Sequence, residues 1–173
     1  MDLFEAIENR RSIRAYTSKD VSEKDIEKLI DAARFAPSAG NIQPWEFIIV
    51  RDAKIKRKLA EAALNQEFIE EAPVVIVVCA DEAQSGQGYG NRGVTLYCIQ
   101  DTAAAIQNIL LAAQALGLGT CWVGAFREDL AEKALNTPPY VRPVAIIPVG
   151  HAAEEPEPRP KRPLKEIVHY ETF

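Results

Sequence analysis

The segment from Gln100 to Leu116 is apolar or small at nearly every position of a helix. Two stripes at helical spacing together cover almost the whole surface of such a helix: Ala103, Ile106, Leu110 and Ala113, and Ala105, Ile109, Ala112 and Leu116. A helix of this kind has to be buried, so we expect it at the centre of the fold. A chain of 173 residues has little other material to cover it completely, which favours burial against a second subunit.

Helices and strands follow one another irregularly around this central helix. Apolar spacing and capping residues predict a short helix around residues 3–7, a helix between Ser22 and Pro37, and helices at 53–64 and 128–135. Strands are predicted at 47–50, 74–80, 120–123 and 144–149, and the run 74–80 is typical of a strand buried on both faces. Polar residues and glycines predict loops at 37–44 and 81–95. The length indicates one domain, 1–173.

The C-terminal segment 155–173 differs in composition from the rest of the chain. Four of the eleven prolines lie at 156, 158, 160 and 163. They predict an extended arm that covers about 25 Å at roughly 3.1 Å per residue. Apolar residues follow in its second half: Leu164, Ile167, Val168, Tyr170 and Phe173. Because such a terminus needs a surface to bury against, we expect the arm to cross a partner subunit.

Charge and motif content argue against several classes of protein. A formal net charge of -5 repels a polyanion, so no nucleic acid is expected as a partner. The N-terminus lacks the apolar core of a secretory signal, and the longest apolar run, Val74–Ala80, is too short to cross a membrane. We therefore expect a cytoplasmic protein without a membrane partner. Cys79, Cys98 and Cys121 lack disulfide or metal-ligand spacing, so we expect buried free thiols and no metal site.

No sequence motif identifies a catalytic group of the protein itself. Gly88, Gly90 and Gly93 match the spacing of a dinucleotide fingerprint, but they lie well after the strand that ends at Ala80, and position 113 is not acidic. A flexible loop is the favoured interpretation of these glycines. The motifs of phosphate loops, serine hydrolases and zinc proteases are absent. The chemistry therefore requires a bound cofactor.

Two basic clusters stand out in this acidic chain. Three arginines lie within residues 10–14 and four cations within residues 159–165. Guanidinium groups bind phosphate in bidentate geometry, and the hydroxyl of Ser12 adds a donor to the same oxygens. The alternative is a solvated basic surface, which is the more common origin of such charge runs.

Two further segments carry groups that suit a heterocyclic ligand. The loop 37–45 holds Ser38, Asn41 and Gln43 beside an indole, although an ordinary turn between a helix and a strand uses the same residue types. The glycines of residues 117–124 let backbone amides approach a ligand closely. The alternative there is strand packing with Trp122 in the core.

Taken in order, these segments resemble the motifs of the FMN-dependent nitroreductases, and the resemblance runs along nearly the whole chain. RRSIRAY at 10–16 looks like the phosphate and ribityl site of that family, and PSAGNIQPWEF at 37–47 like its flavin-facing loop. DTAAAIQNILLAAQALGLGTCW at 101–122 is similar to its central helix and following strand. VRPVAIIPVGH at 141–151 and PKRPLKEIVHYE at 160–171 resemble its C-terminal part.

The resemblance implies an α+β fold of three layers, in which a mixed, mostly antiparallel sheet is flanked by helices. It also implies a homodimer that exchanges its C-terminal arms and holds FMN at the subunit interface. One chain would hold the phosphate and ribityl end through six residues: Arg10, Arg11, Ser12, Arg14, Lys161 and Arg162. The partner subunit would line the isoalloxazine with five: Pro37, Ser38, Ala39, Asn41 and Gln43.

Further contacts to the flavin are implied by the same resemblance. Backbone donors near flavin N5 would come from Val123, Gly124 and Ala125. Hydrogen bonds to the pyrimidine edge would come from Asn65 and Gln66. This chain has Phe68 where longer members of the family carry a lysine. It also lacks their long helical insertion over the pocket.

The implied activity is that of an FMN-dependent NAD(P)H oxidoreductase. Hydride would pass from NADH or NADPH through flavin N5 to a small acceptor such as a nitroaromatic or a quinone, with ping-pong kinetics. Tyr89 and Arg92, in the loop 84–93, are candidates for the substrate pocket, and the alternative is an exposed loop without a ligand. Two other functions stay open: a flavin-binding storage, sensor or interaction module without efficient turnover, and a sister activity such as dehalogenation or flavin fragmentation.

Overall fold

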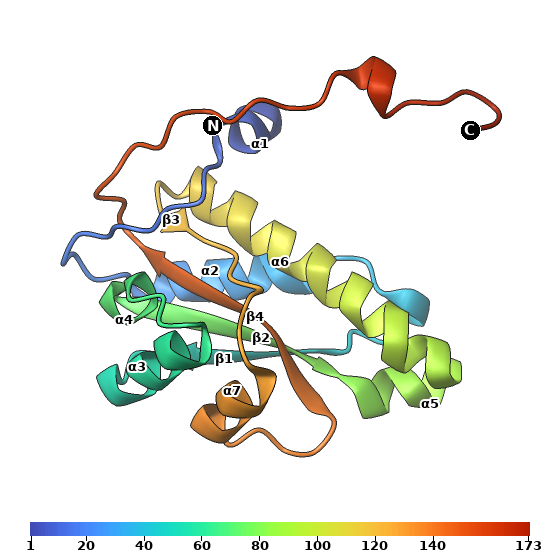
Figure 1. The fold of residues 1–173 in the computed structure, drawn as a ribbon, viewed down its shortest axis with the longest axis horizontal. Helices are drawn as coiled ribbons and strands as arrows, with labels where there is room; N and C mark the ends of the chain where they lie inside the picture. The colour runs from blue at the N-terminus through green and yellow to red at the C-terminus, as the bar shows by residue number, and fades with distance from the viewer.

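A four-stranded antiparallel sheet in the order β1-β2-β4-β3 forms the middle layer of the molecule (Figure 1). The computed structural model describes residues 1–173, the whole chain. The strands are β1 (Trp45–Val50), β2 (Val74–Asp81), β3 (Gly119–Thr120) and β4 (Val141–Gly150). An isolated bridge between Ser12 and Thr120 is parallel, and it is the only parallel pairing in which one of these strands takes part. Helices lie on both sides of the sheet, so the α+β fold of three layers is confirmed.

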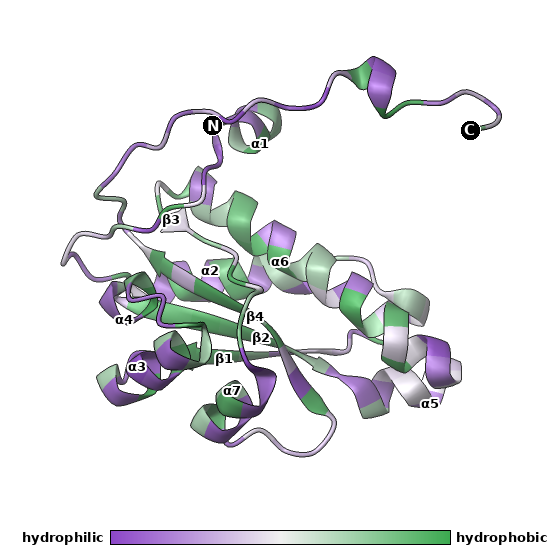
Figure 2. Cartoon of the chain, viewed as in Figure 1, coloured by the Kyte–Doolittle hydropathy of each residue, from purple (hydrophilic) through white to green (hydrophobic).

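Strand β2 is buried on both faces, as its unbroken apolar run predicts. Successive side chains of a strand point to opposite faces, and β2 alternates between two separate hydrophobic cores. Val74, Ile76 and Val78 belong to the first core. Val75, Val77 and Cys79 belong to the second. Figure 2 shows β2 and β4 as apolar strands between helices that are more polar on their outer sides.

The helices divide between these two cores. The first core is covered by α2 (Glu23–Arg34) and α6 (Cys98–Ala115), and the second by α3 (Ala53–Ala62), α4 (Phe68–Glu71) and α7 (Glu128–Leu135). The predicted start of α2 is confirmed, because the hydroxyl of Ser22 accepts the N–H of Asp25 at 3.1 Å. The short N-terminal helix α1 (Leu3–Asn9) ends just before the basic stretch.

The central helix α6 is confirmed, but this chain buries only part of its surface. Eight of its residues are buried: Cys98, Asp101, Thr102, Ala105, Ile106, Ile109, Leu110 and Ala113. On another side Leu111, Ala112 and Ala115 line a shallow apolar groove together with residues of α1 and with Phe35. Phe35 is 72% exposed. A single chain therefore leaves an apolar face beside α6 without cover.

The segment 81–95 is helical, so the prediction of a loop there is wrong. Helix α5 (Glu82–Arg92) begins where the side chain of Asp81 accepts the N–H of Gln84 at 2.8 Å, and a π-helix η2 (Gly93–Tyr97) connects it to α6. The glycines permit close packing instead of flexibility. A Cβ atom on Gly88 would lie 2.3 Å from Cδ1 of Ile42. Only near Gly90, with a φ of 54°, does the helix kink.

The predicted strand 120–123 is shorter than expected. Strand β3 ends at Thr120, and Val123 returns to the sheet through an isolated bridge to Ile146. Trp122 between them is 40% exposed, so its side chain is not part of the core. Residues 121–122 interrupt the pairing at this edge of the sheet, although Gly119, Thr120 and Val123 keep the same antiparallel register against β4.

The C-terminal arm is extended, as predicted. The residues just before it pair with residues 15–17: the N–H of Thr17 donates to the carbonyl of His151 and that of Ala153 to the carbonyl of Ala15, both at 2.9 Å. Beyond this pairing the arm holds one short 3-10 turn, η3 (Leu164–Glu166). Figure 1 shows its end projecting clear of the other elements. The apolar side chains at this end are all exposed: Leu164, Ile167, Val168, Tyr170 and Phe173.

Several other features bear on the predictions from composition. The three cysteines are free and buried, as expected. No group of three or more His, Cys, Asp or Glu side chains is placed to hold a metal ion. None of the helices combines the length and the apolar character needed to cross a bilayer.

Candidate functional site

The first basic cluster and the C-terminal arm line one hollow of about 870 Å³, called here the basic hollow. It brings together five of the predicted phosphate ligands: Arg10, Arg11, Ser12, Arg14 and Lys161. Arg159 of the arm adds a further cation. Three carboxylates also reach it: Glu8, Glu154 and Glu157. Five cations against three carboxylates leave two positive charges in excess. The basic hollow therefore has the charge and the donors to bind a small anion.

Arg162 is the predicted phosphate ligand that the single chain does not bring into the basic hollow. Its Nη2 donates to the carbonyl of Glu166 at 3.0 Å, and its side chain is largely exposed. In one chain, Arg162 thus lies on the free part of the arm.

The backbone of the basic stretch is fixed by contacts on both sides. The N–H of Ile13 donates to the carbonyl of Thr120 at 2.9 Å, and the N–H of Arg14 donates to the carboxylate of Glu154. Tyr16 donates its hydroxyl to the carbonyl of Ile13 at 2.6 Å. A Cβ atom on Gly119 would lie only 2.9 Å from Cγ1 of Ile13, so this close approach requires a glycine. The arginines consequently project from a backbone that is already held in place.

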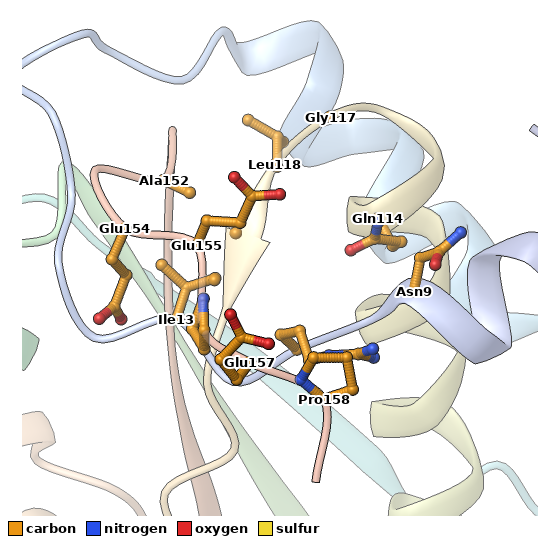
Figure 3. A pocket seen from close by; sticks show the side chains of 13 residues that line it. Asn9, Ile13, Gln114, Gly117, Leu118, Ala152, Glu154, Glu155, Glu157 and Pro158 are labelled. Atoms are coloured by element: carbon orange, nitrogen blue, oxygen red, sulfur yellow. The ribbon is translucent and has the colours of Figure 1, made fainter.

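A second hollow of about 540 Å³ adjoins the first beneath the arm. Figure 3 shows Glu155 and Glu157 of the arm near Ile13, across from Asn9 and Gln114. Glu154 lines both hollows. The acidic lining of this second hollow opposes an anion, so the basic hollow is the candidate for a phosphate.

Two titratable groups beside the basic hollow, those of the half-buried Tyr16 and the buried Cys121, stay uncharged at neutral pH. Burial raises the pKa of the Tyr16 phenol. Burial also raises the pKa of the Cys121 thiol, and the nearby Arg14 and a hydrogen bond with Ser12 offset this only in part. The charge in the hollow therefore comes from its arginines, its lysine and its glutamates.

The predicted flavin-facing loop 37–44 lies at the other end of β2. The N–H of Asp81, the last residue of β2, donates to the carbonyl of Pro44 at 2.9 Å. The basic stretch instead adjoins the first residues of β2, where the ring of Tyr16 and that of Pro73 both lie against Gly150. An eight-residue strand spans about 24 Å at roughly 3.4 Å per residue. One chain therefore presents two separate half-sites, at opposite ends of the sheet (Figure 1).

The backbone of the loop 37–44 has an unusual conformation. Gly40, Asn41 and Gln43 have φ values of 57°, 56° and 57°. The hydroxyl of Ser38 accepts the N–H of Gln43 at 2.9 Å and closes the loop on itself. The side chains of the predicted residues are exposed or half-buried: Pro37, Asn41 and Gln43 exposed, and Ser38 and Ala39 half-buried. Left-handed backbone at non-glycine residues concentrates at functional sites, and this loop fits that pattern.

The turn at 64–66 repeats this feature. Leu64 and Asn65 both have a φ of 61°. Nε2 of Gln66 donates to the carbonyl of Ala63 at 2.9 Å and, more weakly, to that of Ala125 at 3.4 Å. The structure thus brings together two segments predicted to contact the flavin, the turn 65–66 and residues 124–125.

Residues 123–125 differ in what they can donate. The N–H of Val123 is bonded to the carbonyl of Ile146 at 3.0 Å, so Val123 has no backbone donor to offer, contrary to the prediction. The N–H groups of Gly124 and Ala125 have no acceptor within the chain, and both residues are exposed. A strand position whose N–H is used by the sheet cannot be distinguished from a free one by sequence pattern alone.

Tyr89 and Arg92 lie on α5 and not on a loop. The Tyr89 hydroxyl would be 2.7 Å from a Cβ atom on Gly40, so this side chain packs against the loop 37–44. Its ring meets that of Tyr97 edge-on, with centroids 5.1 Å apart. Nε of Arg92 donates to the hydroxyl of Tyr97 at 2.9 Å. The cluster of Tyr89, Arg92 and Tyr97 therefore borders the predicted flavin-facing loop.

The contacts of three residues at these half-sites were not predicted from the sequence. Tyr97 orders the aromatic cluster. Phe68 lies beneath the guanidinium of Arg14, 5.9 Å from the ring centroid to Cζ. Asp101, on α6, reaches the loop 37–44. Tyr97 lies 8 residues from Tyr89 in the chain. Phe68 lies 54 residues from Arg14, and Asp101 lies 62 residues from Ala39. Only a helical spacing could have suggested the first of these contacts.

Known proteins resemble this chain in sequence along most of its length. The sequence model of the Nitroreductase family matches residues 7–66 and 62–151. A Methanothermobacter thermautotrophicus protein, named for NADH dehydrogenase and NAD(P)H nitroreductase, is 40% identical over 160 residues, which cover 90% of this chain and 80% of that protein. The FMN reductase (NADPH) of Bacillus subtilis is 31% identical over 182 residues, which cover 98% of this chain and 73% of that enzyme.

Solved structures agree over nearly the full chain. The NADPH:FMN oxidoreductase of Vibrio harveyi, solved in complex with NAD+, has a TM-score of 0.91 at 26% identity. The match covers 99% of this chain and 77% of that one. Because the family pattern spans most of the sequence and close relatives match it almost from end to end, this chain belongs to the nitroreductase family.

Proposed function

We propose that this chain is an FMN-dependent NAD(P)H oxidoreductase that reduces a small acceptor such as a nitroaromatic or a quinone. The observation that carries the proposal is the basic hollow, where Arg10, Ser12 and Arg14 meet the arm with an excess of positive charge. The names of two relatives, FMN reductase and NADPH:FMN oxidoreductase, support the same cofactor. FMN, when bound, supplies hydride transfer at its N5 atom between the nicotinamide and the acceptor.

The donors of the basic hollow fit the phosphate end of FMN. A phosphate monoester carries between one and two negative charges near neutral pH, and the hollow has two positive charges in excess. Arg10 and Arg14 offer paired N–H donors, and the hydroxyl of Ser12 adds a second kind of donor. Arg11, Arg159 and Lys161 complete the cationic lining. Arg162 joins it only if the free part of the arm moves or belongs to another copy.

The second group of residues fits the ring end of FMN. The free N–H groups of Gly124 and Ala125 are fixed donors, and such donors stabilise negative charge that develops on a reduced ring. Gln66 donates through Nε2 within the chain and keeps its Oε1 as an acceptor for an N–H of the pyrimidine edge. The exposed amide of Asn65 lies beside it. These residues position the ring, and none of them transfers a proton or a hydride.

A homodimer with two composite sites follows from the separation of the half-sites. The loop with Ser38, Asn41 and Gln43 lies a strand length away from the basic hollow, so a second copy has to bring this loop to the flavin. The uncovered apolar face beside α6 and the exposed apolar end of the arm support the same assembly. The arm of each copy then crosses the other.

We assign the enzyme to the cytoplasm.

The acceptor side of the site is assigned to the cluster of Tyr89, Arg92 and Tyr97 on α5 and η2. The Tyr89 ring borders the loop 37–44 and offers a surface on which a planar acceptor or a nicotinamide stacks. Arg92 offers a cation for a phosphate of the donor nucleotide. Donor and acceptor use the same place in turn, so the kinetics are expected to be ping-pong.

Anaerobic rapid mixing of the holoprotein with NADH or NADPH tests the activity. We expect at least one of the two to bleach the flavin absorbance, and the reduced protein to be reoxidised by a quinone or a nitroaromatic in a separate mixing step. Flavin that stays bound and oxidised with both nucleotides would sink the oxidoreductase assignment. A flavin storage or sensor module would then describe the protein.

Replacing Arg10 by glutamate tests the phosphate site. The variant loses a charge-assisted contact worth about 1.5 to 3 kcal/mol, which lowers FMN affinity by about 10- to 150-fold, and like-charge repulsion adds to this loss. Fluorescence titration of the apoprotein with FMN measures the dissociation constant. Lys133→Glu, an exposed cation on α7, makes the same change of net charge away from the site and is expected to bind as the parent does. Parent-like affinity of Arg10→Glu would refute the placement of the phosphate.

Deleting residues 155–173 tests the role of the arm. The deletion removes Arg159 and Lys161 from the basic hollow together with the apolar end of the arm, so we expect loss of both the dimer and the FMN. Light scattering gives the mass of the particle, and absorbance gives the flavin content. Deleting only 169–173 keeps these cations and three of the five apolar residues, so it is expected to weaken the dimer and FMN binding less than the full deletion does. A protein without residues 155–173 that stayed dimeric and retained FMN would contradict the assembly.

A further inference from the structure

Asp101 is a buried carboxyl group with only one hydrogen-bond partner. It lies in the first turn of α6, and 7% of its surface is exposed. Its Oδ1 accepts the N–H of Ala39, 62 residues earlier in the chain, at 3.1 Å. Its Oδ2 is buried without a partner. Burial raises the pKa of this carboxyl, and the N–H of Ala39 lowers it in part. A buried group of this kind is costly, so its presence calls for a compensating role.

The N–H that Asp101 binds begins the 3-10 turn η1 (Ala39–Asn41) of the loop 37–44. Ser38 precedes this turn at the capping position, but its side chain makes no capping bond. Its hydroxyl accepts the N–H of Gln43 instead. Asp101 therefore supplies, from another helix, an acceptor for the N–H of Ala39, one of the groups at the start of a helical turn that have no partner within the turn.

This bond is also the one hydrogen bond that ties residues 38–43 to another element. The other hydrogen bonds of these residues stay within the loop, from Asn41 to Ser38, from Ile42 to Ala39, from Gln43 to Ser38 and from the Gln43 side chain to Asn41. On its other side the loop has only packing contacts with α5, through Gly40 and Ile42. Residues 38–43, which include the left-handed backbone, thus have a single polar anchor, and the loop is next held at Pro44, whose carbonyl accepts the N–H of Asp81.

We propose that Asp101 is a positioning residue of the flavin site, which acts through the N–H of Ala39 to hold the loop 38–43 in the conformation that presents Asn41 and Gln43. The inference rests on the proposed function, because it assigns this loop to the flavin. Asp101 itself does not touch the cofactor. The loop requires Asp101 to provide a hydrogen-bond acceptor at Oδ1, and it does not require a negative charge on this side chain.

Two substitutions at Asp101 separate these properties. Asp101→Ala removes the acceptor, and loss of a cap of this kind changes an equilibrium by about 2- to 30-fold. We expect the loop amides of the flavin-free protein to exchange hydrogen faster by that factor, and the dissociation constant for FMN to rise by a similar one. Asp101→Asn keeps an oxygen acceptor in the same place and is expected to restore both values to within about threefold of the parent.

Thr102→Val provides the matched control. Thr102 is the neighbouring residue of α6, it is also buried, and its hydroxyl donates to the carbonyl of Cys98 at 2.7 Å without reaching the loop. This variant loses a hydrogen bond within α6, so its melting temperature is expected to fall while exchange in the loop 38–43 stays at the parent rate. A general loosening of α6 would accelerate exchange in both variants.

Each result decides between the two proposals. Parent-like exchange in Asp101→Ala would overturn the role of Asp101, and so would a failure of Asp101→Asn to restore it. Faster exchange with unchanged FMN affinity would also overturn that role, because the loop would then not serve the flavin site. If the parent protein itself bound no FMN, the proposed function would fail, while the exchange rates of the flavin-free proteins would still report whether Asp101 holds the loop.

Discussion

Strand β2 is buried between two hydrophobic cores, and both the fold and the site depend on this burial. Each fully buried valine or isoleucine contributes about 1.5 to 3 kcal/mol, and β2 carries such side chains on both faces. A strand of this kind needs helices on each side, which α2 and α6 provide on one and α3, α4 and α7 on the other. Its length also fixes the distance between the basic hollow at its start and the loop 37–44 at its end.

That distance connects the fold to the proposed chemistry. Neither half-site holds all the groups that are proposed to bind the flavin, since the cations lie at one end of the sheet and the loop with exposed amides at the other. Two copies related by a twofold axis would join the half-sites twice, and they would also cover the apolar face beside α6. The same contact between subunits would thus stabilise the central helix and complete the cofactor site. In this arrangement the protein positions the cofactor, and the cofactor reacts.

The sequence predicted the features that depend on local pattern and on charge. The two-sided burial of β2, the cap of α2 and the extended arm follow from residue spacing, and the meeting of Arg10–Arg14 with the arm follows the family motifs. The helix α5 was missed because its glycines suggested flexibility, whereas Gly88 lies against Ile42 from a distant segment. The bond from Asp101 to Ala39 and the use of the Val123 N–H by Ile146 were likewise beyond reach. Such contacts depend on tertiary structure, which leaves no periodic signal in the sequence.

The assignment of the basic hollow to a phosphate is tested most directly by comparing FMN with riboflavin, which has the same ring and ribityl chain but no phosphate. Fluorescence titration of the apoprotein at fixed salt gives both dissociation constants. Two charge-assisted contacts of about 1.5 to 3 kcal/mol each predict that FMN binds at least about 100-fold more tightly, and that this ratio falls as salt is added. Equal affinity for the two flavins would contradict the assignment, because the five cations of the hollow would then contribute nothing to binding.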